Sequence, residues 1–328
     1  MITCQTWVEH WEMHEPFEIA REIITAQPVL LLRLTDATGL TGQAEAAGVD
    51  YDGETPDSMA RQTAQFAPSL SDAIDGQQLL AHLTSGGARN ALDCALWDLR
   101  AKQTGVPAWR TAGLTELRPV TTAYTIGLGD PATTRRKIRA ARDRYPILKL
   151  KVDARRHMDV VKMARQEHPQ ARLVVDANQS WSLALLRELL PGLQSLGVEL
   201  IEQPLPRCDD AELDALQPSI PLAADESCTD RACLPTLVGR YQYVNIKLDK
   251  CGGLTEALAM ADAAAALGLG LMVGNMCGTS LAMAPAFLLA QRCSYVDLDG
   301  PLLQKQDREP AMRFDGEMVW PPEGGLWG

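Results

Sequence analysis

Ionisable side chains end several short apolar segments in the middle of this 328-residue chain, at intervals of 22 to 26 residues. They are Lys151, Asp176, Glu202, Asp225 and Lys247. Three carboxylates with no histidine or thiolate among them select a hard divalent cation, so we expect Asp176, Glu202 and Asp225 to bind Mg²⁺, with Mn²⁺ as a substitute. The five histidines lie away from these segment ends, which argues against a zinc hydrolase.

Lysines at both ends of this series suggest proton transfer at a carbon atom. A neutral lysine can remove an α-proton, and a cation on the substrate carboxylate can stabilise the enediolate that results. If Lys151 and Lys247 face opposite sides of one substrate, one abstracts a proton and the other delivers one. The expected reaction is therefore a 1,1-proton transfer, which is a racemisation or an epimerisation. Lys149 precedes Lys151 by two residues, so both lie on the same side of a strand.

The segments that carry these residues have the spacing of a (β/α) barrel. Strand candidates, each with a helical stretch nearby, span residues 120–126, 147–152, 172–176, 198–202, 221–225, 243–247, 270–274 and 295–297. Nearly continuous apolar strands indicate a sheet that is buried on both faces. In a closed barrel the carboxyl ends of the strands form the active-site face, which would bring the ionisable residues together. An open doubly wound sheet is the alternative, although the first turn, 127–131, lacks a full glycine fingerprint for a dinucleotide.

The N-terminal third has a different texture. Apolar segments at 2–7, 29–34 and 40–45 predict a β-meander, and the stretch 14–28 between the first two strands is expected to be irregular. Residues 58–105 have a helical pattern, which ends in 88–102 with Gly105 as the stop signal. We therefore expect an α+β domain before the barrel.

Composition excludes several functions. Lys and Arg number 31 against 42 Asp and Glu, and the resulting charge of −11 makes nucleic acid and anionic membrane poor partners. The eight cysteines form no C-x-x-C pair, and the N-terminus lacks the pattern of a signal peptide, so we expect a cytoplasmic protein. The uncharged segment 263–291 is interrupted by glycines and Pro285, which is typical of buried elements in a large fold, not of a membrane span.

The strand-end motifs resemble those of a known family. They read Lys149-Leu-Lys151, Asp176-Ala-Asn178, Glu202-Gln-Pro204, Asp225-Glu226-Ser227 and Lys247-Leu-Asp249, the last followed by Gly252-Gly253. Together they resemble the signature set of the enolase superfamily, muconate-lactonising subgroup. The resemblance implies an α/β fold: a (β/α)7β TIM-type barrel over 113–302, an N-terminal α+β capping domain over 1–112, and a C-terminal segment, 303–328, that returns to complete the cap. It also implies that Lys151 and Lys247 are the acid/base pair, and that Lys149 is a supporting cation near the substrate carboxylate.

The last strand is similar to that of one branch of this superfamily. Asp297-Leu-Asp299 resembles the Asp-x-Asp motif of the dipeptide epimerases, where two carboxylates hold the α-ammonium group of the substrate. Alternation along a strand places Asp297 and Asp299 on one face, which suits a cation site. Thr125 and Asn275 are further substrate contacts by the same resemblance. It implies a dipeptide substrate with L-Ala-D/L-Glu as the first candidate, in cell-wall (murein) peptide metabolism.

The side chain of the substrate stays open at this point. Arg21, in the stretch 14–28 that should close over the substrate, offers a partner for a glutamate side chain. Glu22 and the acidic residues Asp50, Asp52 and Glu54 instead favour a hydrophobic or cationic dipeptide. An N-acylamino acid racemase, a cycloisomerase and a non-catalytic metal-binding barrel are the remaining alternatives, and assembly into a homo-oligomer is compatible with each of them.

Overall fold

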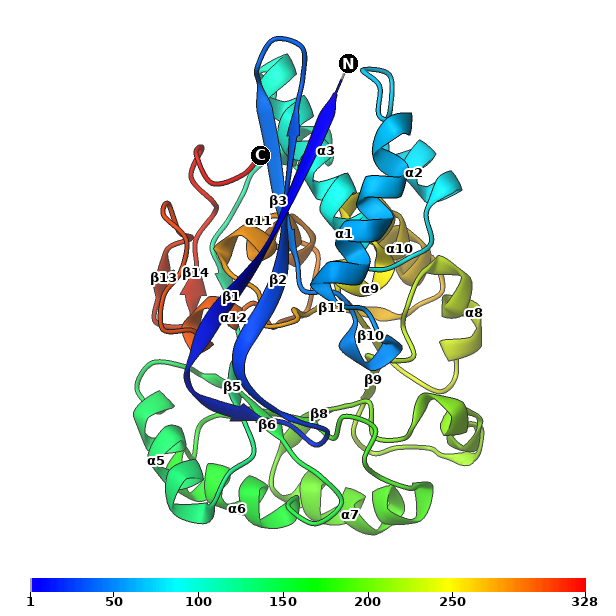
Figure 1. The fold of residues 1–328 in the computed structure, drawn as a ribbon. Coiled ribbons are helices and arrows are strands. Elements are labelled where there is room, and N and C mark those ends of the chain that lie inside the picture. The colour runs from blue at the N-terminus through cyan, green and yellow to red at the C-terminus, as the bar shows by residue number, and fades with distance from the viewer. Residues whose placement is uncertain (1) are drawn as a thin grey trace.

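Eight short strands form one curled parallel sheet in the computed structural model, which describes residues 2–328 (Figure 1). They are β5 (Tyr124–Ile126), β6 (Ile147–Lys151), β7 (Arg172–Asp176), β8 (Val198–Glu202), β9 (Leu222–Ala224), β10 (Tyr243–Ile246), β11 (Gly270–Val273) and β12 (Tyr295–Val296). Their order in the sheet follows their order in the chain. The amide of Ala123 donates to the carbonyl of Val296 at 2.8 Å, which joins the first strand to the last. The predicted TIM-type barrel is confirmed, and the open doubly wound alternative is wrong.

Alternation along the strands separates two apolar layers. Leu148 and Leu150 of β6 belong to the main core outside the sheet, while Lys149 and Lys151 lie inside the barrel. Four charged residues, Lys149, Asp176, Glu202 and Asp225, each follow an apolar residue by two positions. These apolar residues belong to a separate cluster and are Ile147, Val174, Leu200 and Ala223. The period of two therefore stacks the charged layer directly on an apolar layer.

Helices cover the outside of the barrel. The longer ones are α5 (Pro131–Ala141), α6 (Met158–Glu167), α7 (Leu183–Ser195), α10 (Leu254–Ala266) and α11 (Ser280–Ala290). Side-chain caps start several of them, and Asp130 accepts from the amides of Ala132 and Thr133 at the start of α5. The connections after β8 and β9 are shorter than the expected helices: a 3₁₀ stretch, η3 (Arg207–Ala215), and then η4 (Arg231–Cys233) with α8 (Leu234–Leu237). Short helices α9 (Leu248–Cys251) and α12 (Gly300–Leu303) follow β10 and β12.

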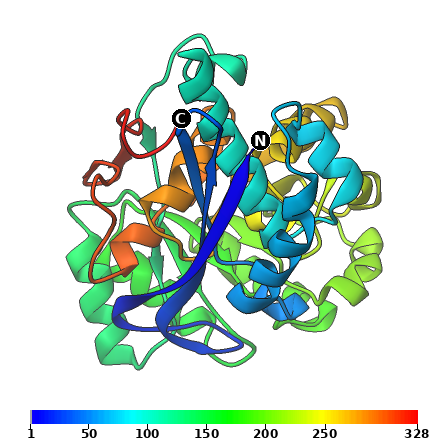
Figure 2. The same ribbon diagram turned by 45° about the horizontal axis from the view of Figure 1, so that its top comes forward.

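The cap combines an antiparallel sheet with helices. Its sheet has the order β1 (Thr3–Glu18), β2 (Ile23–Thr35) and β3 (Thr41–Ala46). A short turn, η1 (Asp50–Asp52), leads into α1 (Pro56–Phe66), which continues through η2 (Ala67–Ser69) to α2 (Gly76–His82), α3 (Gly87–Thr104) and α4 (Ala108–Thr111). The meander and the helical pattern expected for this part of the chain are present. Figures 1 and 2 show the sheet and α3 extending away from the barrel, with the N-terminus at their outer end.

The expectation of an irregular stretch at 14–28 is wrong. β1 and β2 continue as a hairpin to its end, where Phe17 pairs with Ile24 and Glu18 with Ile23 after a register shift. The amide of Leu128, in the loop after β5, donates to the carbonyl of Glu18 at 2.8 Å. The views agree that this hairpin runs from the cap to the green part of the barrel (Figures 1 and 2). The pairing of β1 with β2 persists to the end of the hairpin because the loop after β5 contacts it there. The local sequence does not reveal this contact.

The strand expected at 120–126 is divided between two sheets. β4 (Val120–Thr121) pairs antiparallel with β14 (Met318–Val319), which also pairs with β13 (Phe314–Asp315), so only Tyr124–Ile126 joins the barrel. The C-terminal segment that provides β13 and β14 ends on α3 of the cap. There Trp327 is buried and its Nε1 donates to the carbonyl of Cys94 at 2.9 Å.

The uncharged segment 263–291 divides into the end of α10, β11 and α11. Across residues 2–328, none of the helices combines the length and the apolar character that crossing a membrane requires.

Candidate active site

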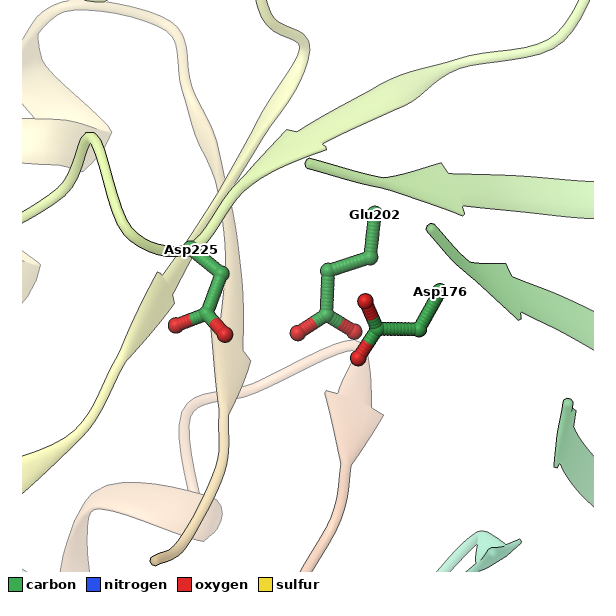
Figure 3. Close-up of side chains that lie close together, drawn as sticks. All are labelled: Asp176, Glu202 and Asp225. Carbon is green, nitrogen blue, oxygen red and sulfur yellow. The ribbon is translucent and has the colours of Figure 1, made fainter. Parts of the chain in front are cut away.

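Strand register aligns three carboxylates at the carboxyl end of the barrel. Asp176 of β7 lies opposite Lys151 of β6 on one side and Glu202 of β8 on the other, and Asp225 follows β9 directly. Figure 3 shows the three acidic side chains turned toward one region of space. One oxygen atom of each lies within 4.8 Å of the others, and all three residues are buried. The sequence-predicted triad is thus brought together.

The predicted lysines lie at the two ends of this row. Lys151 Nζ is 2.6 Å from Asp176 Oδ2, and Lys247 Nζ is 2.8 Å from Asp225 Oδ2. Lys149 lies between this row and Asp297 of the last strand, because its Nζ is 2.9 Å from Glu202 Oε2 and 2.8 Å from Asp297 Oδ2. Lys149 and Lys151 both contact Asp176, as their spacing on one strand predicts.

Burial and ion pairing set the charges of the row. Burial raises the pKa of Asp176, but the positive charges of Lys151 and Lys149 outweigh it and bring the pKa down to about 2. Burial, reinforced by the charge of Asp176, raises the pKa of Glu202 to about 7. Burial opposes the ionised form of Asp225 as well, yet Lys247 and Lys250 hold the pKa of this carboxyl well below its usual range.

The donor set fits a divalent metal. Glu202 Oε2 is buried and accepts no hydrogen bond, although Lys149 Nζ lies 2.9 Å away. A buried carboxylate oxygen needs a positive charge or a hydrogen-bond donor beside it, and a metal ion held by the three carboxylates would supply a positive charge in addition to Lys149. Three carboxylates on neighbouring strands supply the oxygen ligands that hard divalent cations prefer.

Several residues that support the row were not singled out from the sequence. Lys250 Nζ is 2.6 Å from Asp225 Oδ1 and also donates to the carbonyl of Asn245 at 3.0 Å. Asn178 Oδ1 accepts from Lys151 at 3.1 Å, and Asn245 Nδ2 donates to Glu202 Oε1 at 2.8 Å. Asn245 stands on β10 two positions before Lys247, so strand alternation could have found it. Asn178 lies beyond the end of β7, and only the motif Asp176-Ala-Asn178 points to it. Lys250 is brought back to Asp225 by the short helix α9, which no strand pattern reveals.

A second acidic pair lies where the first and last strands meet. Asp297 and Asp299 are buried, and the amide of Thr125 on β5 donates to Asp299 Oδ2 at 2.7 Å. Burial and the neighbouring charge of Asp297 raise the pKa of Asp299 to about 7. Asn275 acts on the same loop, because its Nδ2 donates to the carbonyl of Asp297 at 2.7 Å. The structure thus brings Thr125 and Asn275 to the acidic pair. The hydrogen bond of Thr125 orients Asp299, and that of Asn275 orients the backbone of Asp297.

A cavity of about 360 Å³ opens above the row. Lys151 and Lys247 line it from the barrel, and the end of the β1–β2 hairpin lines it from the cap. Arg21 reaches this cavity, but its Nη1 lies 2.8 Å from Glu226 Oε1, and its guanidinium lies 4.7 Å from the ring centre of Tyr51. The hairpin end therefore places the guanidinium of Arg21 in the cavity wall. This guanidinium is already paired with the buried carboxylate of Glu226.

Comparison with known proteins gives matches over both parts of the chain. Residues 1–113 match the family model "Mandelate racemase / muconate lactonizing enzyme, N-terminal domain", and residues 133–326 match the model "Enolase C-terminal domain-like". The L-Ala-D/L-Glu epimerase of Escherichia coli (strain K12) is 40% identical over 317 residues, which are 96% of this chain and 98% of that protein. An N-acetyl-D-glutamate racemase from a Pseudoalteromonas species is 42% identical over 261 residues, which are 79% of this chain and 82% of that protein.

A solved structure is similar over the whole length. It is an enolase family member from Agrobacterium tumefaciens with homology to dipeptide epimerases, determined with bound sodium and L-Ala-L-Glu. It is 38% identical to this chain with a TM-score of 0.97, and the match covers 100% of both chains.

Proposed function

Because this chain belongs to the enolase superfamily and, within it, to the dipeptide epimerases, we propose that it inverts the α-carbon of the C-terminal residue of a dipeptide. L-Ala-L-Glu and L-Ala-D-Glu are the first candidate substrates. The observation that carries the proposal is the placement of Lys151 and Lys247 at opposite ends of one row of carboxylates. A substrate whose carboxylate is held at the centre of that row exposes its α-carbon to both lysines.

The two lysines do the proton chemistry in this proposal. In one direction Lys151 Nζ takes the α-proton and Lys247 Nζ delivers a proton to the opposite face, and the roles reverse in the other direction. Each lysine must be neutral when it abstracts. The ion pairs with Asp176 and Asp225 hold the two amino groups in place before the substrate binds.

Asp176, Glu202 and Asp225 would hold the metal, with Mg²⁺ as the proposed ion and Mn²⁺ as a substitute. A divalent ion there supplies Lewis-acid stabilisation of the negative charge that develops on the substrate carboxylate. Lys149, placed between this row and Asp297, adds positive charge beside the same carboxylate.

Asp297 and Asp299 would hold the α-ammonium group of the dipeptide. Two carboxylates within reach of Thr125 and Asn275 make a fixed acceptor site for a cation. Arg21 is the proposed partner of an acidic side chain on the C-terminal residue of the dipeptide. To bind that side chain, Arg21 would have to give up its ion pair with Glu226. Glu22 and Asp50 line the same cavity, which keeps hydrophobic and cationic dipeptides as alternatives.

A second candidate is the racemisation of an N-acylated amino acid. It is favoured by one observation, the 42% identity to a protein named N-acetyl-D-glutamate racemase. An N-acyl group carries no ammonium, so this candidate gives Asp297 and Asp299 no charge to bind.

We also propose that the enzyme works in the cytoplasm, because all eight cysteines are free thiols in the structure.

The test is incubation of the Mg²⁺-loaded protein in D₂O with L,L-dipeptides and N-acetyl amino acids, read by mass. Gain of one deuterium at the C-terminal residue of L-Ala-L-Glu, with formation of L-Ala-D-Glu, is the expected result. Exchange confined to hydrophobic or basic dipeptides would discard the role of Arg21 but keep the mechanism. Exchange confined to N-acetyl amino acids would replace the leading candidate by the second.

A further inference from the structure

Two cysteines meet in the loop that follows β9. Cys228 comes three residues after Asp225, and its amide donates to the carbonyl of Asp225 at 2.9 Å. Cys233 is the last residue of η4, and its amide donates to the carbonyl of Asp230 at 3.3 Å. The loop folds back between these points, so that the thiol of Cys228 donates a hydrogen bond to the sulfur of Cys233. The two sulfur atoms are therefore neighbours.

The two thiols differ in exposure and in pKa. Cys228 is only 1% exposed, whereas Cys233 is half-buried. The hydrogen bond between them lowers the pKa of Cys233 to about 6, in spite of its burial, and raises the pKa of Cys228 well above its usual range. All eight cysteines lie within the described residues 2–328, and the pKa of each of the other seven is raised. At neutral pH the structure thus holds a thiolate at Cys233 beside a protonated thiol.

The groups around the pair leave this difference in place. Lys250 of α9 favours a thiolate at Cys228, but the neighbouring Cys251 and Cys233 itself oppose it. The sulfur of Cys233 lies 2.9 Å from the carbonyl of Asp230, to which the protonated thiol can donate, and the charge of Asp230 also opposes the thiolate. Backbone hydrogen bonds to the same sulfur favour the thiolate and act together with the thiol of Cys228.

We propose that Cys228 and Cys233 are a redox modification site, at which a peroxide converts the two thiols into a reversible disulfide. An accessible thiolate next to a second thiol is the arrangement that redox-sensing cysteines use. Disulfides of this transient kind occur in the cytoplasm, where structural ones are rare. Neither cysteine lines the main cavity, so the inference goes beyond the proposed function and does not depend on it.

The modification takes two steps. In the first, the thiolate of Cys233 attacks one oxygen of the peroxide, so that an S–O bond forms, the O–O bond breaks and hydroxide leaves. The sulfur is oxidised to a sulfenic acid and the peroxide is reduced. In the second, the sulfur of Cys228 attacks the sulfenic sulfur, so that the S–S bond forms and the S–O bond breaks. The proton of Cys228 leaves with the hydroxyl group as water, and a dithiol can later reduce the disulfide again.

The experiment treats the reduced, full-length, Mg²⁺-loaded protein with a small excess of hydrogen peroxide. Remaining thiols are blocked with N-ethylmaleimide, and the tryptic peptides are read by mass. Trypsin cleaves after Arg231, between the two cysteines, so the disulfide would join peptide 208–231 to peptide 232–240. We expect this joined pair, lighter by two hydrogen atoms than the sum of its parts, and we expect dithiothreitol to separate it.

Cys208→Ser is the matched control. Cys208 is exposed and lies in the same tryptic peptide as Cys228, so it is the other cysteine that could join the two peptides. The joined pair should form unchanged in this variant. Cys228→Ser should not form it and should instead stop at a sulfenic acid on Cys233, which dimedone traps.

The rate of alkylation by iodoacetamide tests the thiolate separately. For Cys233 of the wild type, the rate should rise with a midpoint near pH 6. Cys228→Ala removes the hydrogen-bond donor and should shift this midpoint up, toward the value of about 8.5 of an ordinary thiol. Loss of the joined pair in Cys208→Ser, or a wild-type midpoint near that of an ordinary thiol, would overturn the inference.

Discussion

Lys151 Nζ lies 2.6 Å from Asp176 Oδ2, and these residues are the last pair that β6 and β7 share. Lys247 and Asp225 repeat the arrangement at the other end of the row, at 2.8 Å. Each lysine is therefore anchored to the outer carboxylate on its own side, with Glu202 between the two. This spacing suits the proposed reaction, which needs one amino group on each face of a planar intermediate.

The first prediction concerns these two lysines. Lys151→Met and Lys247→Met should each lower the rate of dipeptide epimerisation by about 10³-fold, within the range that general acid–base groups contribute. The measurement is conversion of L-Ala-L-Glu to L-Ala-D-Glu, followed together with deuterium uptake. Lys162→Met, at an exposed position on α6, is the control and should keep full activity. Full epimerisation in either active-site variant would exclude the two-base mechanism.

Metal binding gives the second prediction. A ligand that binds only the folded state raises stability by about 2.7 kcal/mol at a hundredfold excess over its Kd. We therefore expect added MgCl₂ to raise Tm of the chelator-treated wild type, and Glu202→Gln to lose most of this rise. Glu199→Gln, on the same strand but paired with Arg172 outside the site, should keep it. An equal rise in Tm for Glu202→Gln and the wild type would mean that the metal binds elsewhere.

Most of the charged layer of the barrel was predictable because Lys151, Asp176, Glu202, Asp225 and Lys247 each stand at or directly after the end of an apolar strand. In β6, alternating leucine and lysine already separate the outer core from the interior, and the register then places Asp176 and Glu202 beside Lys151. These relationships depend only on a period of two and on parallel neighbours. Thus the triad and its two flanking lysines come together as the sequence indicates.

Contacts between distant segments were not predictable in the same way. Phe17 finds Cys277 and Leu303 only because the hairpin end crosses to the barrel, and nothing in the local sequence encodes that crossing. The contact of Thr125 with Asp299 depends on closure of the first strand against the last. Lys250 reaches Asp225 through a single helical turn after β10. In each case the partner lies more than twenty residues away and is chosen by tertiary packing.

The third prediction separates dipeptides from N-acylated amino acids. Asp297→Asn removes one of the two carboxylates proposed for the α-ammonium group, and hydrogen bonds to charged groups contribute about 1.5 to 3 kcal/mol. KM for L-Ala-L-Glu should therefore rise by roughly ten- to a hundredfold, whereas the reaction of any N-acetyl amino acid should change less. Asp262→Asn, at an exposed ion pair with Arg292, is the control. An unchanged KM for the dipeptide would favour the N-acyl candidate.

The fourth prediction concerns a buried carboxyl between the cap and the barrel. Asp93 on α3 is 1% exposed and accepts from the amide and the hydroxyl of Thr255 on α10, and burial raises its pKa to about 6. Its value in the unfolded chain is about 3.9, so the folded state binds this proton more tightly, by about 3 kcal/mol. The resulting stability is complete below pH 4 and is lost as pH rises through 6.

The variant Asp93→Asn tests this prediction, because its side chain cannot ionise but can still accept a hydrogen bond from the Thr255 amide. The free energy of unfolding of the variant, minus that of the wild type, should therefore increase by about 2 kcal/mol between pH 4 and pH 7, measured by urea unfolding. A difference that is constant with pH would show that Asp93 titrates normally and that its burial has no electrostatic cost.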